Sequence, residues 1–148
     1  MGGDLASATG RAAYMVGMSG MGPERFEGDG AENGSWKDRR EARKELSERF
    51  REIGGQLMNR ASGDFQHDAI AAVLADPAKR AFAAEMLGQA YVTAFNLIRH
   101  NKDAVETIAD TLVERKELYG NELVELLDSA KLEKPTIELT KEEAWPTM

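Results

Sequence analysis

Apolar residues recur at intervals of three and four positions along most of this sequence, which is the pattern of amphipathic α-helices. The clearest region covers residues 85–127 and a few residues before it, and it holds three such segments in succession. We expect each segment to bury one apolar stripe against its neighbours. The three stripes are Phe82, Met86, Ala90, Ala94 and Leu97; Val105, Ile108, Ala109, Leu112 and Val113; and Leu123, Val124, Leu126 and Leu127.

Short joints separate these three segments. The first segment closes at His100 and Asn101, with Asn101 expected in a left-handed helix end. Gly120 permits a turn with positive φ between the second and third segments, and Asn121 is placed to cap the third. Joints this short predict a helical hairpin followed by a third packed helix.

The N-terminal residues predict another helix, flanked by glycines. Asp4 stands where an N-cap is expected, and the helix should end between Gly17 and Gly20. Its apolar face is Leu5, Ala8, Ala12, Met15 and Val16. Residues 21–35 combine glycine, proline, asparagine and acidic residues without periodicity, which predicts an exposed, mobile acidic loop.

A further helix is expected from Ser35, because its spacing from Asp38 matches a capping box. Its apolar face is Leu46, Phe50, Ile53, Leu57 and Met58. Charges of both signs fill the other face between residues 37 and 51, which is typical of a solvated helix surface. Pairing of Glu41 with Lys44, or of Glu45 with Arg49, would contribute about 0.2–0.5 kcal/mol each.

Two glycines, Gly54 and Gly55, should weaken or bend that helix by roughly 1 kcal/mol each relative to alanine. Residues 59–66 predict a turn, and residues 67–75 a short helix. Asp76 and Pro77 then form a helix boundary, with aspartate as the N-cap and proline at the first helical position. This boundary opens the helix that carries the first apolar stripe.

The tail after residue 130 leaves the helical pattern. Residues 136–139 can form a short strand, but a frayed tail is favoured because Pro135, Pro146 and dense charge surround them. Trp145 is the unusual residue of this tail. It is either simply exposed or it docks on a partner.

These elements predict an all-α helical bundle of about five or six helices, with a mobile acidic loop and an irregular C-terminal tail. We expect residues 1–130 to form the helical domain and residues 131–148 the tail. The chain has 148 residues, of which 42% are hydrophobic and 30% charged, so one domain with a real core is expected.

The composition also excludes several classes of function. Cysteine is absent, so the chain has no disulfide and no thiolate metal site. A formal net charge of −7 argues against general nucleic-acid binding. The sequence contains no apolar run long enough to span a membrane and no signal-peptide pattern, so we expect a cytoplasmic protein without a membrane segment.

No complete catalytic apparatus is visible in these residues. The chain lacks a Walker A loop, a Rossmann glycine fingerprint, a G-x-S-x-G elbow and an H-E-x-x-H motif. Its two histidines, His67 and His100, are far apart in sequence, and a structural role near helix ends is favoured for both. A site that combines them with Asp4 is conceivable, but no spacing supports it.

Two segments resemble FtsH-type AAA+ zinc metalloproteases, and together they extend over about residues 2–130. The first is similar to a D-L-x-x-A-T-x-x-A-x-x-M-V helix with a following G-M turn. It comprises Gly2, Gly3, Asp4, Leu5, Ala8, Thr9, Ala12, Met15, Val16, Gly20, Met21 and Gly22. The second is similar to the last helices of that family. It comprises Ala90, Tyr91, Ala94, Asn101, Ala104, Ile108, Ala109, Leu112, Glu114, Leu118, Gly120, Glu122, Leu126 and Leu127. Residues 23–80 depart from the family pattern and suggest a divergent lineage.

This resemblance implies a helical peptidase domain in which an upstream H-E-x-x-H motif supplies two zinc-binding histidines and a glutamate base. The third zinc ligand of the family is the aspartate of the Asp-Leu segment, which corresponds to Asp4. The resemblance further implies protein or peptide substrates, a homo-oligomeric ring, ATP bound by an upstream module and a full-length protein at the cytoplasmic face of the membrane.

The sequence starts three residues before Asp4, so the histidines, the base and the ATPase module are expected upstream. We therefore expect this chain to be an inactive C-terminal part of such a protease, with no catalytic residue of its own. The alternative is a self-contained helical interaction or regulatory module without catalysis, which uses the charged helix and the Trp145 tail to bind a partner.

Overall fold

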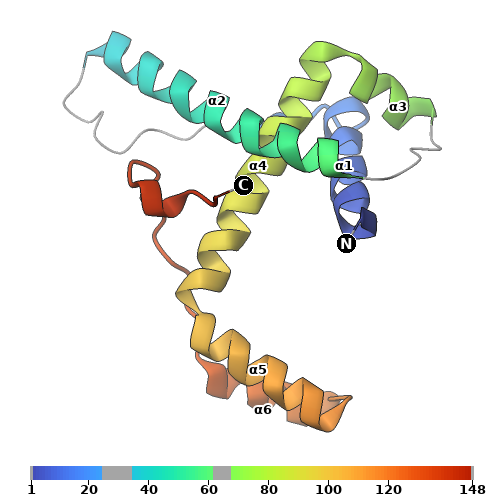
Figure 1. Cartoon of the computed structure of the whole chain (residues 1–148), viewed down its shortest axis with the longest axis vertical. Helices are drawn as coiled ribbons and strands as arrows, with labels where there is room; N and C mark the ends of the chain where they lie inside the picture. The colour runs from blue at the N-terminus through green and yellow to red at the C-terminus, as the bar shows by residue number, and fades with distance from the viewer. Residues whose placement is uncertain (1, 25–34, 62–67, 148) are drawn as a thin grey trace. The chain divides into compact units, whose positions relative to one another are not determined.

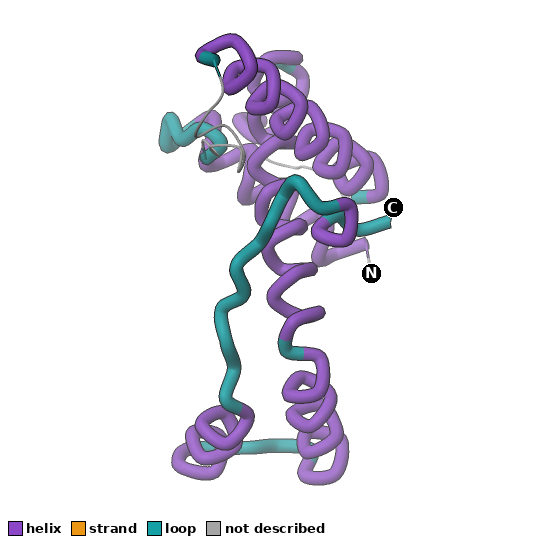
Figure 2. Tube along the Cα trace, turned by 90° about the vertical axis from the view of Figure 1, so that its left-hand side faces the viewer, coloured by secondary structure: helices purple, strands orange, loops and turns teal. Residues whose placement is uncertain are grey.

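The computed structural model describes residues 2–24, 35–61 and 68–147 (Figure 1). These residues form six α-helices and one short 3-10 helix, and Figure 2 shows only helices and loops along the described chain. The α-helices are α1 (Gly2–Gly17), α2 (Trp36–Arg60), α3 (Asp68–Ala75), α4 (Pro77–His100), α5 (Lys102–Arg115) and α6 (Gly120–Ala130), and the 3-10 helix is η1 (Glu142–Ala144). The all-α fold expected from the sequence is confirmed.

Local capping determines where two of these helices begin, as the sequence predicted. Ser35 Oγ accepts hydrogen bonds from the backbone N–H groups of residues 37 and 38, and Asp38 accepts one from the Ser35 N–H at 3.0 Å. Asp76 Oδ1 accepts hydrogen bonds from the N–H groups of Ala78 and Lys79 at 2.9 and 3.0 Å. The hydrogen bond from the Lys79 N–H lowers the pKa of Asp76 below its usual value. The hydrogen bond from Ala78 and the positive charge of Lys79 also lower this pKa, whereas desolvation raises it.

Three expected helix ends are wrong. Asp4 lies inside the first turn of α1 and not at its N-cap, because the helix already begins at Gly2. Asn101 has φ −102° and ψ 27°, so it does not form a left-handed helix end. Asn121 lies within α6, which begins at Gly120; the N-cap position belongs to Tyr119, which makes no side-chain capping bond.

The chain divides into two compact units. The first comprises residues 1–92 and 138–148, and the second comprises residues 93–137, so the boundary falls within α4. The buried apolar residues of the described chain belong to the first unit. They are Ala12, Ala13, Phe50, Ile53, Leu57, Met58, Val73, Ala83, Ala84, Leu87, Val92, Ala144 and Trp145.

The centre of the first unit is a crossing of α2 and α4 that depends on two glycines (Figure 1). A Cβ atom on Gly54 would lie 1.8 Å from the carbonyl oxygen of Ala84, and one on Gly88 would lie 2.0 Å from that of Phe50. The two helices therefore touch backbone to backbone. Gly54 does not break α2, which continues to Arg60.

The buried face of α4 differs from the apolar stripe predicted for it. Phe82 and Leu97 are exposed, as are Ala90 and Ala94. The buried face instead consists of small and polar residues together with Leu87 and Val92. Its members are Ala83, Ala84, Glu85, Leu87, Gly88, Gln89, Val92 and Asn96.

The C-terminal tail is ordered against α2 within the first unit. Trp145 is only 8% exposed, and its ring centroid lies 5.1 Å from that of Phe50. Its indole N–H donates to the Leu139 carbonyl at 2.9 Å, and the Arg49 guanidinium lies over the ring at 4.1 Å. The expectations of a frayed tail, a strand and an exposed Trp145 are therefore wrong for the described residues.

Ion pairs on α2 also differ from those expected. Lys44 pairs with Glu48, whereas Arg49 makes two hydrogen bonds with the tail residue Glu142 at 2.9 and 2.5 Å. Arg49 thus binds the tail through an ion pair with Glu142 and through its contact with the Trp145 ring.

In the second unit, α5 and α6 pack on each other. The sequence predicted a hairpin of the first two segments followed by a third helix, whereas this pair consists of the second and third segments. Arg115 and Glu122 form an ion pair across the joint between the two helices. Asn101, at the end of α4, is buried, and its side chain bonds to the Leu97 carbonyl and to both the N–H and the carbonyl of Glu133. The side chain of Asn101 therefore ties residue 133 to the start of α5.

Candidate functional site

Asp4, the residue singled out as a metal ligand, lies in the first turn of α1 with its side chain exposed. The buried side chains of this helix, Thr9, Ala12 and Ala13, lie towards the core. The Asp4 carboxylate has no hydrogen bond or ion pair to any residue that the structure describes. The carboxylate is thus accessible from solvent.

The histidines do not join Asp4 in a site. His67 lies outside the described residues. His100 is the last residue of α4, and its Nε2 lies 3.6 Å from a Glu133 carboxylate oxygen. Among the described residues, no three histidine, cysteine, aspartate or glutamate side chains are grouped as metal ligands. Asp4 is therefore not part of a group of possible metal ligands within the described residues.

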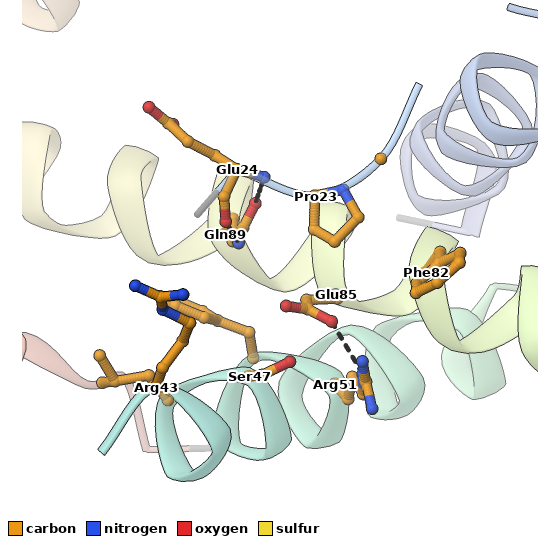
Figure 3. A pocket seen from close by; sticks show the side chains of 11 residues that line it. Pro23, Glu24, Arg43, Ser47, Arg51, Phe82, Glu85 and Gln89 are labelled. Atoms are coloured by element: carbon orange, nitrogen blue, oxygen red, sulfur yellow. Dashed lines mark hydrogen bonds and ion pairs between the residues drawn. The ribbon is translucent and has the colours of Figure 1, made fainter. Parts of the chain in front are cut away.

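A pocket of about 330 Å³ lies between α2, α4 and residues 22–24 (Figure 3). Its apolar lining is provided by Pro23, Leu46, Phe50 and Phe82. Its polar lining comprises Glu24, Arg43, Ser47, Arg51, Glu85 and Gln89. This pocket was not predicted from the sequence, because Arg43, Ser47 and Arg51 lie on a helix face that the apolar spacing marked as solvated.

Two polar contacts fix the walls of this pocket. The Glu85 side chain is nearly buried, and its Oε2 accepts a hydrogen bond from Arg51 Nε at 2.8 Å (Figure 3). The buried Gln89 amide accepts from the Glu24 N–H at 3.0 Å and donates to the Glu24 carbonyl at 2.9 Å. The Gln89 side chain thus bonds to both backbone groups of Glu24 and holds the segment after α1 against α4.

Among the described residues that line the pocket, Ser47 has no histidine, lysine or cysteine beside it, and these are usual partners that activate a nucleophile. The buried carboxylate of Glu85 is held by Arg51. An apolar floor with a few polar groups is typical of a small binding site.

The α5–α6 hairpin presents a different kind of surface. Neither helix contains a buried residue, although both carry the apolar stripes that the sequence predicted. Val113 is 78% exposed and Val124 is 55% exposed. None of the helices that the structure describes has the length and apolar character needed to cross a membrane.

Comparison with known proteins gives no family model, no curated protein and no solved structure that matches this chain.

Proposed function

We propose that this chain is the C-terminal part of an FtsH-like, ATP-dependent zinc metalloendopeptidase that degrades proteins. In the complete enzyme Asp4 is the third zinc ligand, and the helices of this chain support the active site and a ring of subunits. The two similar segments near the ends of residues 2–130 support the family assignment. The zinc-binding histidines, the glutamate base and the ATP-binding module belong to the upstream part of the protein.

The position of Asp4 is the single observation that carries this proposal. A ligating carboxylate must be ionised, accessible and not committed to another partner. Asp4 is exposed in the first turn of α1, and it has no described partner. Bound zinc would activate water and polarise the scissile carbonyl. The role of this chain is to hold the Asp4 oxygens at the start of a helix.

The coding sequence upstream of the Met1 codon provides the first test. The proposal predicts an in-frame H-E-x-x-H motif within a helical pattern, with a Walker A motif further upstream. A stop codon close upstream would refute the proposal. Purified residues 1–148 alone should show no zinc-dependent proteolysis.

A matched pair of variants in the complete protein tests the role of Asp4 directly. Asp4→Asn should lower bound zinc, measured by mass spectrometry, and reduce ATP-dependent degradation of an unfolded protein by at least about 100-fold. Asp103→Asn is the control, because Asp103 is an exposed aspartate in the first turn of α5. Normal zinc content and proteolysis in Asp4→Asn would contradict the proposed ligand.

The second candidate function is a helical interaction module without catalysis, and the α5–α6 surface is the observation that favours it. Exposed apolar residues gathered on one element are typical of a protein–protein contact. The tail is less suited to this role than the sequence suggested, because Trp145 is buried within the chain itself. This candidate predicts no upstream H-E-x-x-H motif.

A further inference from the structure

Within the second unit, the α5–α6 hairpin leaves most of its apolar residues exposed. Each helix packs on the other, yet no residue of either helix is buried. Two helices cannot enclose their apolar stripes without a further element. The exposed large apolar residues of the hairpin and its joint are Val105, Leu112, Val113, Tyr119, Leu123, Val124 and Leu127. We call this set the hairpin face.

The charge around the hairpin face indicates what kind of surface can cover it. Residues 102–130 contain eight acidic and three basic side chains. Asp110, Glu114, Glu125 and Asp128 have no hydrogen bond or ion pair to a described residue. Two hairpin faces packed on each other would bring these carboxylates together, which is unfavourable. A basic surface is therefore a better partner for the hairpin face than the acidic hairpin of a second copy.

The first half of α2 has the complementary properties. Residues 36–44 contain five basic and two acidic side chains, and none of these residues is buried. Trp36 is 63% exposed at the start of this segment. The side chains of Arg39 and Arg40 have no ion pair to a described residue. We call residues 36–44 the basic arm.

We propose that the basic arm of one copy of this chain docks on the hairpin face of a second copy. The arm is a helix, and a helix packed on an apolar surface of a partner is a common mode of recognition. Tryptophan and arginine are the residues that most often dominate such contacts. The unpaired guanidinium groups of the arm would meet the unpaired carboxylates around the hairpin face.

A contact between two different surfaces of the same chain is heterologous, so it can continue from copy to copy. Such contacts generate closed rings or open chains, whereas a symmetric contact stops at a dimer. This inference does not depend on the protease proposal, because residues 1–148 carry both surfaces. It concerns the assembly of this chain even if Asp4 binds no metal.

Complementation between two variants tests the proposal. Arg39→Glu with Arg40→Glu disables the arm, and Asp110→Lys with Asp128→Lys disables the hairpin face. Light scattering after size exclusion should show that residues 1–148 associate. Each variant alone should elute as a monomer at the same concentration, because its self-association constant is at least tenfold lower. An equimolar mixture should form a one-to-one dimer, because each variant retains the surface that the other lacks.

Three outcomes would overturn the proposal: a wild-type chain that stays monomeric at high concentration, an arm variant that still associates, or a mixture that remains monomeric. Circular dichroism should show unchanged helix content in all variants, because the altered side chains are exposed. Arg60→Glu is the control on α2, since Arg60 is exposed at the opposite end of the helix. It should associate like the wild type. The association should weaken as salt concentration rises.

Discussion

At the scale of single residues, the crossing of α2 and α4 depends on two positions without a side chain. We predict that Gly54→Ala destabilises the chain by about 3 kcal/mol, at the upper end of the cost of overpacking a core. The added methyl would meet the Ala84 carbonyl oxygen at 1.8 Å, and a backbone atom cannot turn aside as a side chain can. Denaturant unfolding followed by circular dichroism measures the loss.

The neighbouring glycine provides the control for this prediction. A Cβ atom on Gly55 would meet nothing within 4 Å. Gly55→Ala should therefore stabilise α2 by up to about 1 kcal/mol, the helix preference of alanine over glycine. Equal stability of the two variants would contradict the backbone contact at Gly54.

The sequence predicted both glycines as weak points of α2, and the structure adds a close contact with α4 at Gly54 that Gly55 lacks. Composition and spacing register the local cost of a glycine, which is the same at both positions. The compensating gain at Gly54 comes from α4, 30 residues later in the chain, and no local pattern contains it. Asp4 illustrates the same limit. Its residue type and its exposure fit a ligand, but the residues that would complete a site are not determined by its neighbours in sequence.

At the scale of elements, helix starts follow from local chemistry, and Ser35 gives a direct test. Ser35→Ala removes the acceptor for two N–H groups of the first turn of α2. We expect a loss of about 1 kcal/mol, typical for an N-cap. Hydrogen exchange of residues 36–40 should accelerate, while residues 50–58 stay protected. Uniform acceleration along α2 would argue against a local capping effect.

The same locality explains which elements could be predicted from the sequence. The starts of α2 and α4 were correct because Ser35, Asp76 and Pro77 act on residues within one turn. The buried face of α4 was not, because close helix packing there selects small residues such as Ala84 and Gly88 over large apolar ones. The polar residues of that face gain partners from distant segments, as Gln89 does from Glu24. Apolar spacing detects neither effect.

At the scale of the whole molecule, the chain carries its two tryptophans in opposite environments, and this gives a matched comparison. Trp145→Ala should cost about 3 kcal/mol, because a buried aromatic that packs on Phe50 is lost. Trp36→Ala should change stability by less than about 0.5 kcal/mol, because its side chain is largely exposed. Denaturant unfolding of both variants measures this. Similar values for the two would contradict the docking of the tail.

Docking of the tail should also depend on pH through Glu142. The hydrogen bond from Arg49 lowers the pKa of this carboxyl below its usual value, the Arg49 charge adds to the effect, and desolvation opposes it. The docked state therefore favours the ionised form. The ionised Glu142 carboxylate contributes fully to docking above the pKa of an undocked glutamate, about 4.3. This contribution is lost as the pH falls through the lowered pKa that Glu142 has in the docked state.

Fluorescence of Trp145 in a Trp36→Phe background measures this linkage. As the pH falls from 6 to 3, undocking should shift the emission of Trp145 to longer wavelength, because the indole becomes exposed to water. Adding Glu142→Gln removes the charge, so the tail should already be less docked at pH 6 and should change less on acidification. Identical pH profiles with and without Glu142→Gln would show that other carboxylates control the tail. In that case the contacts of Trp145 with Phe50 and with Arg49 would hold the tail without the charge of Glu142.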